Sequence, residues 1–361
     1  MTPTDPVPPL AAGTPSSPTD VYDVALLDLD GVVYVGPHAV PGVPDALSAA
    51  RAAGMRLGFV TNNAARTPEE VAAHLGELGV PAEPGDVITS SQAAATVVAA
   101  LLGPGAAVLA VGGPGVAAAL EAAGLTVVRR AEEEPAAVVQ GYGREVGWAQ
   151  LAEAVVAVRN GARHVATNTD ATIPSPRGPL PGNGAMVGVV TDVTGRSPLV
   201  TGKPDPAMHA ECVRRTGAQR PLVVGDRLDT DIEGARRAGA ASLLVLTGVT
   251  VPATLLAARP EQRPDLLAAD AGGLLAPHPA VLRTGSTWRC GGWEVRRAEA
   301  DDVLVLAADG DDAGDGLDGL RALCVAHWSR HSGEGAGVRV VASGEPAGRA
   351  LDTWGLAAGG S

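Results

Sequence analysis

Residues 24–32 read VALLDLDGV, an apolar run that leads into two aspartates and a glycine. The run from Val24 to Leu29 predicts a buried β-strand with acidic side chains at its end. Side chains alternate between the faces of a strand, but a turn at the strand end lets Asp28 and Asp30 flank one point. Gly31 gives the backbone freedom that such a turn requires. Alone, this pattern also fits a calcium loop or an ordinary turn.

Short apolar runs alternate with helical stretches on the C-terminal side of this strand. Such alternation predicts an α/β fold, a parallel sheet with helices on both faces, with the ligand at the carboxyl ends of the strands. The expected strands are Met55–Val60, Leu222–Val224 and Ser242–Leu246, and the expected helices are Val43–Ala53 and Thr230–Ala238. A further helix should begin at Thr67-Pro68-Glu69-Glu70, which has the pattern of a capping box.

The chain is expected to contain a core and two additional segments. Residues 1–20 are predicted to be a disordered tail and residues 21–275 a core. A second alternating block at about 90–185 is expected to be inserted in that core. Residues 283–361 hold four of the five tryptophans and predict a small α+β domain.

Lys203 is the single lysine among 27 basic residues, against 40 acidic residues and a formal net charge of −13. A phosphate-binding P-loop needs Gly-Lys followed by Ser or Thr, but here Pro204 follows the lysine. Schiff-base chemistry would have to use this one residue. The acidic balance and the lack of a basic patch argue against nucleic-acid or membrane-surface binding.

The cysteines predict a reducing compartment without a disulfide framework. Cys212, Cys290 and Cys324 are odd in number, far apart and in no metal-binding spacing. Residues 1–20 lack the positive start and apolar centre of a signal peptide. Because the chain also lacks a run of about 20 apolar residues, we expect a cytoplasmic protein.

Three more polar segments follow apolar strands or runs. They are Thr61-Asn62-Asn63, Lys203-Pro204 and the stretch from Gly225 to Ile232, which contains Asp226 and Asp231. Each has an ordinary structural interpretation: a capping turn, a solvated lysine and an acidic helix cap. In this order, together with residues 28–32 and Gly36, they resemble the four motifs of the haloacid dehalogenase (HAD) superfamily. The resemblance covers about residues 22–270.

The closest similarity is to the capped (type IIA, C2) branch that contains p-nitrophenyl, phosphoglycolate and glycerol-3-phosphate phosphatases. It implies a Rossmann-like parallel-sheet core with an inserted α/β cap at about 90–185. It also implies a magnesium-dependent phosphomonoester hydrolase that works through an aspartyl-phosphate. A dehalogenase would need neither the metal nor the second acid, and a phosphonatase would need a cap lysine, which residues 90–185 lack.

The resemblance gives each motif residue an expected role. Asp28 is the nucleophile and Asp30 the general acid and base. Mg²⁺ is held by Asp28, the backbone carbonyl of Asp30 and Asp226, with Asp231 behind them. The residues expected to bind the substrate are Thr61, Asn62 through its backbone amide, Asn63, Asp170 of the cap and the catalytic Lys203.

The substrate is expected to be a small phosphorylated metabolite. The small polar residues of the cap favour a sugar or polyol phosphate, with glycerol 3-phosphate first. Phosphoglycolate, a nucleotide or pyridoxal phosphate are alternatives, because residues 140–143 (QGYG) differ from relatives that have an acidic residue after the glycine. Self-association into a homo-oligomer is left open.

Two further interpretations remain. Residues 112–118 fit the G-x-G-x-x-A pattern of a dinucleotide-binding turn, with Glu132 to Glu134 at a suitable distance for a ribose, which would make the chain an NAD-binding oxidoreductase. Residues 283–361 resemble part of an N-acetyltransferase (GNAT-like) fold, but they lack the expected pyrophosphate cradle. This segment is therefore considered as a docking or regulatory module.

Overall fold

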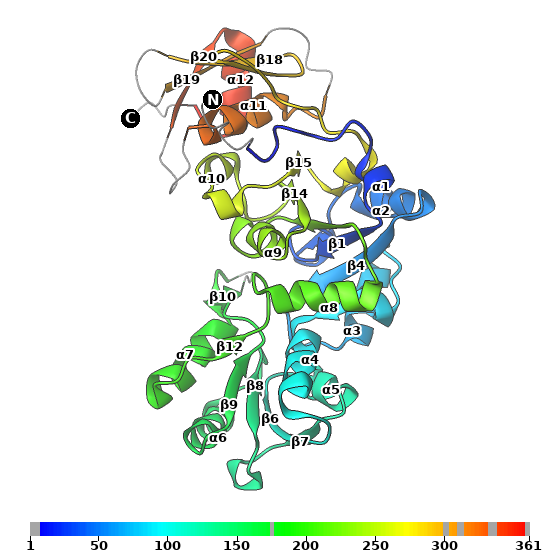
Figure 1. Ribbon diagram of the computed structural model, residues 1–361, viewed down its shortest axis with the longest axis vertical. Helices are drawn as coiled ribbons and strands as arrows, with labels where there is room; N and C mark the ends of the chain where they lie inside the picture. The colour runs from blue at the N-terminus through cyan, green and yellow to red at the C-terminus, as the bar shows by residue number, and fades with distance from the viewer. Residues whose placement is uncertain (1–7, 174–176, 299–302, 309–313, 331–337, 358–361) are drawn as a thin grey trace, which may run out of the picture. The chain divides into compact units, whose positions relative to one another are not determined.

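A computed structural model describes residues 8–173, 177–298, 303–308, 314–330 and 338–357 (Figure 1). The chain divides into two compact units, one formed by residues 1–57 and 220–361 and the other by residues 58–219. The first unit thus combines the two ends of the sequence, and the second is continuous. Among the described residues, no helix has the length and apolar character needed to cross a bilayer.

A parallel sheet in the first unit places β1 beside β13, then β14 and β15. The strands are β1 (Val24–Asp28), β13 (Pro221–Gly225), β14 (Ala241–Val245) and β15 (Leu266–Ala268). The accompanying helices are α1 (Pro18–Val21), α2 (Val43–Ala52), α9 (Glu233–Arg237) and α10 (Pro252–Leu256), and a small hairpin joins β2 (Tyr34–Val35) to β3 (His38–Ala39). The predicted strands and the parallel sheet are confirmed.

The predicted helix over Thr230–Ala238 begins differently. A π-helical turn over Leu228–Ile232 precedes α9, and the carbonyl of Arg227 accepts from the amides of both Asp231 and Ile232. π-helical turns are rare and concentrate at functional sites. Here the wide turn determines where Asp231 lies.

A five-stranded sheet forms the C-terminal part of the first unit. Its strands are β16 (Leu282–Thr284), β17 (Thr287–Cys290), β18 (Trp293–Arg297), β19 (Val303–Ala308) and β20 (Arg339–Ser343). Helices α11 (Asp318–Trp328) and α12 (Glu345–Thr353) accompany it. The pairing is antiparallel except between β19 and β20. This confirms the mixed α+β character predicted for the segment.

One hydrophobic core joins the C-terminal sheet to the parallel sheet. Leu244 of β14 and Leu267 of β15 belong to the same buried cluster as Trp328 of α11. The indole of Trp328 donates to the carbonyl of Leu256 over 3.1 Å. Every residue of α11 is buried, and its buried Arg321 pairs with Asp315 and Asp318.

Residues 8–20 differ from the predicted disordered tail. Leu10 is 3% exposed and lies in the same core cluster. The backbone of Thr14 pairs with that of His278, and the amide of Val281 donates to the carbonyl of Ala11. The Pro- and Ser-rich composition of residues 1–20 predicted disorder, although Leu10 packs into the core. Residues 1–7 lie outside the described residues.

In the second unit β4 (Arg56–Thr61), which begins in the first, pairs in parallel with β5 (Val87–Thr89). Helix α3 (Pro68–Glu77) has the predicted capping box, with Thr67 and Glu70 exchanging hydrogen bonds. Helices α4 (Ser90–Leu102) and α8 (Pro206–Thr216) pack against each other.

A second parallel sheet in this unit has the order β12-β9-β8-β6-β7. The strands are β6 (Ala107–Val111), β7 (Thr126–Val128), β8 (Ala137–Gln140), β9 (Arg163–Ala166) and β12 (Leu199–Val200), and a hairpin joins β10 (Thr172–Ile173) to β11 (Leu180–Pro181). Alternate residues of the strands pack against α4 and α5 (Pro114–Ala122) on one face and α6 (Trp148–Arg159) and α7 (Asn183–Thr194) on the other (Figure 1). Since β12 belongs to this sheet, the sheet extends beyond residue 185.

Candidate active site

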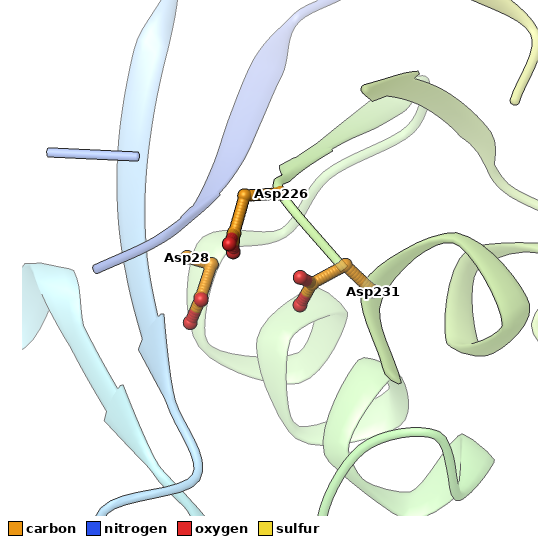
Figure 2. Close-up of side chains that lie close together, drawn as sticks. All are labelled: Asp28, Asp226 and Asp231. Atoms are coloured by element: carbon orange, nitrogen blue, oxygen red, sulfur yellow. The ribbon is translucent and has the colours of Figure 1, made fainter. Parts of the chain in front are cut away.

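Three carboxylates converge in the first unit. One oxygen each from Asp28, Asp226 and Asp231 lies within 4.8 Å of the others (Figure 2). Asp28 is the last residue of β1, and Asp226 directly follows β13. These two strands are hydrogen-bonded neighbours in the sheet. Adjacent parallel strands end at the same edge of a sheet, so both side chains reach one place. Asp226 and Asp231 are each 1% exposed.

Small residues allow the backbone to wrap closely around Asp226. A Cβ on Gly31, whose φ is +88°, would lie 2.5 Å from Asp226 Oδ2, and one on Gly248 would lie 1.9 Å from the same oxygen. The Val249 amide donates to that oxygen over 2.6 Å, and the Thr247 hydroxyl donates to the Gly31 carbonyl over 2.5 Å. These contacts give the Asp226 carboxylate one defined orientation.

Asp231 comes to the cluster from the π-helical turn. Its Oδ2 accepts from the amide of Arg227 over 3.1 Å, which closes the loop that follows β13. A Cβ on Gly225 would lie 2.2 Å from the Asp231 Cβ. Glycine at this position therefore allows Asp231 to approach the strand end.

The three carboxylates fit a hard divalent cation. Three negative charges this close repel one another in a buried site, and a cation offsets the repulsion. An all-oxygen donor set suits Mg²⁺, which binds through a few carboxylates and keeps waters for a substrate phosphate. Asp30 is exposed and is not part of the cluster, and its expected metal contact through the backbone carbonyl stays a prediction.

A second group of predicted site residues follows β4. Thr61 is 4% exposed and its Oγ1 accepts from the Asn63 amide over 3.0 Å. The exposed Asn63 accepts through its Oδ1 from the amide of Ala65, an Asx turn. Thr61 and Asn63 thus form the turn that shapes the strand end, and their expected contacts with substrate stay predictions.

Lys203 and Asp170 lie beside Asn62 in the second unit. The Asn62 carboxamide contacts both backbone groups of Lys203 and the Asp170 carboxylate. The structure therefore brings Asn62, Asp170 and Lys203 together, although more than 100 residues separate the first from the others. Sequence patterns carry no signal for this pairing.

The glycine run at residues 112–118 packs against protein backbone. A Cβ on Gly113 would lie 2.7 Å from Ala65 Cα, and one on Gly115 would lie 2.4 Å from the Arg66 carbonyl oxygen. The Gly115 amide donates to the Ala65 carbonyl. Residues 64–66 fill the space that a dinucleotide pyrophosphate would need at the start of α5, so the alternative of an NAD-binding oxidoreductase is wrong.

The aspartates cluster at the carboxyl ends of adjacent parallel strands, where α/β proteins of Rossmann-like fold bind their ligands. The profile of haloacid dehalogenase-like hydrolases matches residues 25–126, and a related HAD-like profile matches residues 200–274. The chain belongs to the haloacid dehalogenase-like hydrolase family. It is 43% identical to the D-glycerol 3-phosphate phosphatase of Mycobacterium tuberculosis, over 93% of this chain and 94% of that protein.

A solved structure and a further relative agree with this assignment. The crystal structure of the M. tuberculosis glycerol phosphate phosphatase with magnesium has a TM-score of 0.84, at 43% identity, and covers 94% of this chain and 99% of that one. An acid sugar phosphatase of Staphylococcus aureus is 38% identical over 63% of this chain and 88% of that protein. A profile of GCN5-related N-acetyltransferase-like domains matches residues 290–356, which confirms the resemblance of the C-terminal segment.

Proposed function

We propose that this chain hydrolyses D-glycerol 3-phosphate in a magnesium-dependent reaction. The observation that carries the proposal is the cluster of Asp28, Asp226 and Asp231 at the ends of adjacent parallel strands. The phosphatase class follows from the family and from named phosphatases at 38–43% identity. The substrate follows from the relative whose length the chain matches almost completely.

Each site residue has a definite task in this reaction. Asp28 attacks phosphorus and forms an aspartyl-phosphate, so that one difficult displacement becomes two easier steps. Asp30 protonates the leaving alkoxide and then takes a proton from the attacking water. Thr61, the backbone amide of Asn62 and Lys203 bind the phosphoryl oxygens, where charge develops during transfer.

Asp28, Asp226 and the backbone carbonyl of Asp30 would hold Mg²⁺, with Asp231 behind them. When bound, the cation supplies positive charge that offsets the carboxylates and the phosphate dianion. Lys203, the single lysine of the chain, adds a compact point charge. A guanidinium there would favour a bidentate geometry instead.

A substrate panel tests the proposal. We expect magnesium-dependent phosphate release from p-nitrophenyl phosphate, and the highest kcat/KM for glycerol 3-phosphate among sugar, polyol, glycolate, nucleotide and pyridoxal phosphates. A sugar phosphate as the best substrate would move the assignment toward the acid sugar phosphatase relatives. Absence of phosphate release from every compound would contradict the proposal.

The nucleophile has its own test. We expect Asp28→Asn to lower kcat by at least about 1,000-fold, because an amide cannot form the aspartyl-phosphate. The far-UV circular dichroism spectrum should stay unchanged. Retained turnover in a folded Asp28→Asn protein would refute the role of Asp28.

A cytoplasmic location is part of the proposal. Cys212, Cys290 and Cys324 are buried free thiols, and burial raises the pKa of Cys212 and Cys290 to about 12. Thiols of this kind suit a reducing compartment. Self-association into a homo-oligomer is also a proposal, and analytical ultracentrifugation tests it.

A further inference from the structure

The side chain of Asn62 binds the backbone of Lys203 from two sides. Its Nδ2 donates to the Lys203 carbonyl over 3.2 Å, and its Oδ1 accepts from the Lys203 amide over 2.9 Å. The carboxamide thus pairs with the two backbone groups of one residue. Such a double contact fixes the orientation of the backbone from which the Lys203 ammonium projects.

Asn62 has no side-chain donor left for a substrate. Its second Nδ2 hydrogen lies toward Asp170 Oδ2, at 3.3 Å, so both N–H groups are in use. A phosphate dianion needs donors, and only the backbone amide of Asn62 could supply one. The side chain therefore serves another purpose than substrate binding.

Asn62 is itself held in place by buried neighbours. Its carbonyl accepts from Ser90 Oγ and from Asn168 Nδ2, each over 2.7 Å. Asn168 is 3% exposed, and its own carbonyl accepts from Asn183 Nδ2 over 2.7 Å. The clamp on Lys203 therefore rests on a network that includes the loop after β9 and the start of α7.

Gly202 completes the arrangement. A Cβ at this position would lie 2.2 Å from the Thr167 carbonyl oxygen and 2.8 Å from Asn62 Oδ1. The residue before the lysine must therefore lack a side chain for the carboxamide to reach the Lys203 amide.

We infer that Asn62 is a positioning residue that holds Lys203 for phosphate binding, with Asp170 and Asn168 orienting Asn62. The inference deepens the proposed function and rests on it, because Lys203 is the proposed phosphate ligand. It assigns the Asn62 side chain an indirect role, and it makes Asp170 a partner of Asn62.

A double-mutant cycle tests this inference. The four proteins are wild type, Asn62→Ala, Lys203→Ala and the double variant, with Asn160→Ala as the control at an exposed position of the same unit. The readouts are kcat/KM for p-nitrophenyl phosphate and the inhibition constant of inorganic phosphate, both at saturating Mg²⁺. We expect Asn62→Ala to lower kcat/KM by about 10- to 100-fold and to weaken phosphate binding.

The effect of Asn62→Ala in the Lys203→Ala protein distinguishes a positioning role of Asn62 from a role independent of Lys203. If Asn62 acts through Lys203, its loss should change both readouts by less than about threefold in the Lys203→Ala protein. Equal effects in both backgrounds would overturn the inference. If Asn62→Ala does not fold, the nearly isosteric Asn62→Asp replaces it, because it loses the donor that contacts the Lys203 carbonyl.

The positioning role of Asn62 can be tested even if the proposed phosphatase function is wrong. If the wild-type protein releases no phosphate, calorimetric binding of inorganic phosphate to the same four proteins still measures the coupling. Coupled losses of phosphate affinity would then support the positioning role, and independent losses or unchanged binding would refute it.

Discussion

Gly248 illustrates how strongly a single residue can constrain the proposed metal site. Because its Cβ would lie 1.9 Å from Asp226 Oδ2, Gly248→Ala must displace the carboxylate or the loop. We expect the Mg²⁺ concentration for half-maximal activity to rise by about 10-fold or more. Gly188→Ala is the control, since a Cβ there meets nothing within 4 Å. An unchanged Mg²⁺ titration for Gly248→Ala would contradict the role of Asp226 as a ligand.

His164 makes stability depend on pH. It is 6% exposed, and burial lowers its pKa from 6.5 to about 4. Between these pH values the unfolded chain binds a proton that the folded chain does not. Burial of the neutral His164 therefore leaves the free energy of unfolding undiminished above pH 6.5. That free energy falls as the pH decreases from 6.5 toward 4.

At pH 4.5 the loss from His164 should amount to about 2–3 kcal/mol. His164→Gln should therefore lose less free energy of unfolding than the wild type between pH 7.5 and pH 4.5, as measured by urea denaturation. His38→Gln, at an exposed position, is the control. Equal pH dependence of His164→Gln and wild type would show that His164 has no such effect.

Sequence patterns indicate the carboxylate residues of the site but not the side-chain contacts around the site, such as the one between Asn62 and Lys203. Asp28 and Asp226 are predictable because both follow apolar strands, and strand ends of a parallel sheet meet. The contact between Asn62 and Lys203 joins residues 141 positions apart. Amide side chains pair with whatever the fold brings near them, so one sequence does not reveal the partner.

Helix α3 is the element whose start the sequence predicts best. Thr67 Oγ1 accepts from the Glu70 amide, and Glu70 Oε2 accepts from the Thr67 amide. We expect Thr67→Ala to lower the free energy of unfolding by about 1 kcal/mol. Glu69→Gln, in the same turn but outside the capping bonds, should change it by less than about 0.5 kcal/mol. A neutral Thr67→Ala would mean that α3 does not depend on its cap.

The π-helical turn at Leu228–Ile232 is an element that propensity does not predict. Local preference favours an ordinary α-helical start at Thr230. The hydrogen bond from the Arg227 amide to Asp231 Oδ2 and the space beside Gly225 favour the wider turn. Tertiary contacts thus override the local preference at the site itself.

At the scale of the molecule, the C-terminal segment is integrated with the core. Trp328 is 3% exposed and contacts the Leu256 carbonyl. Trp328→Ala should lower the free energy of unfolding by about 3–5 kcal/mol. Trp148→Ala, at an 84% exposed position, is the matched control.

Thermal unfolding also distinguishes an integrated domain from a docking module. We expect phosphatase activity and far-UV circular dichroism of Trp328→Ala to be lost together at a lowered temperature. Loss of the circular dichroism signal in a separate early step, with activity retained, would favour an independent docking or regulatory domain. The sequence did not predict the integration, because the concentration of tryptophans in residues 283–361 indicated only a separate domain.

The pairing of β1 with β13 also has a consequence for biosynthesis. The strands are neighbours in the sheet, yet Val24 pairs with Pro221, so almost two hundred residues must leave the ribosome before β1 can pair with β13. The continuous unit at 58–219 can fold during that interval, since domains fold as their chains emerge. Asp226 and Asp231 follow β13, so the carboxylate cluster around Asp28 can form only late in translation, and an unfinished chain lacks the proposed metal site.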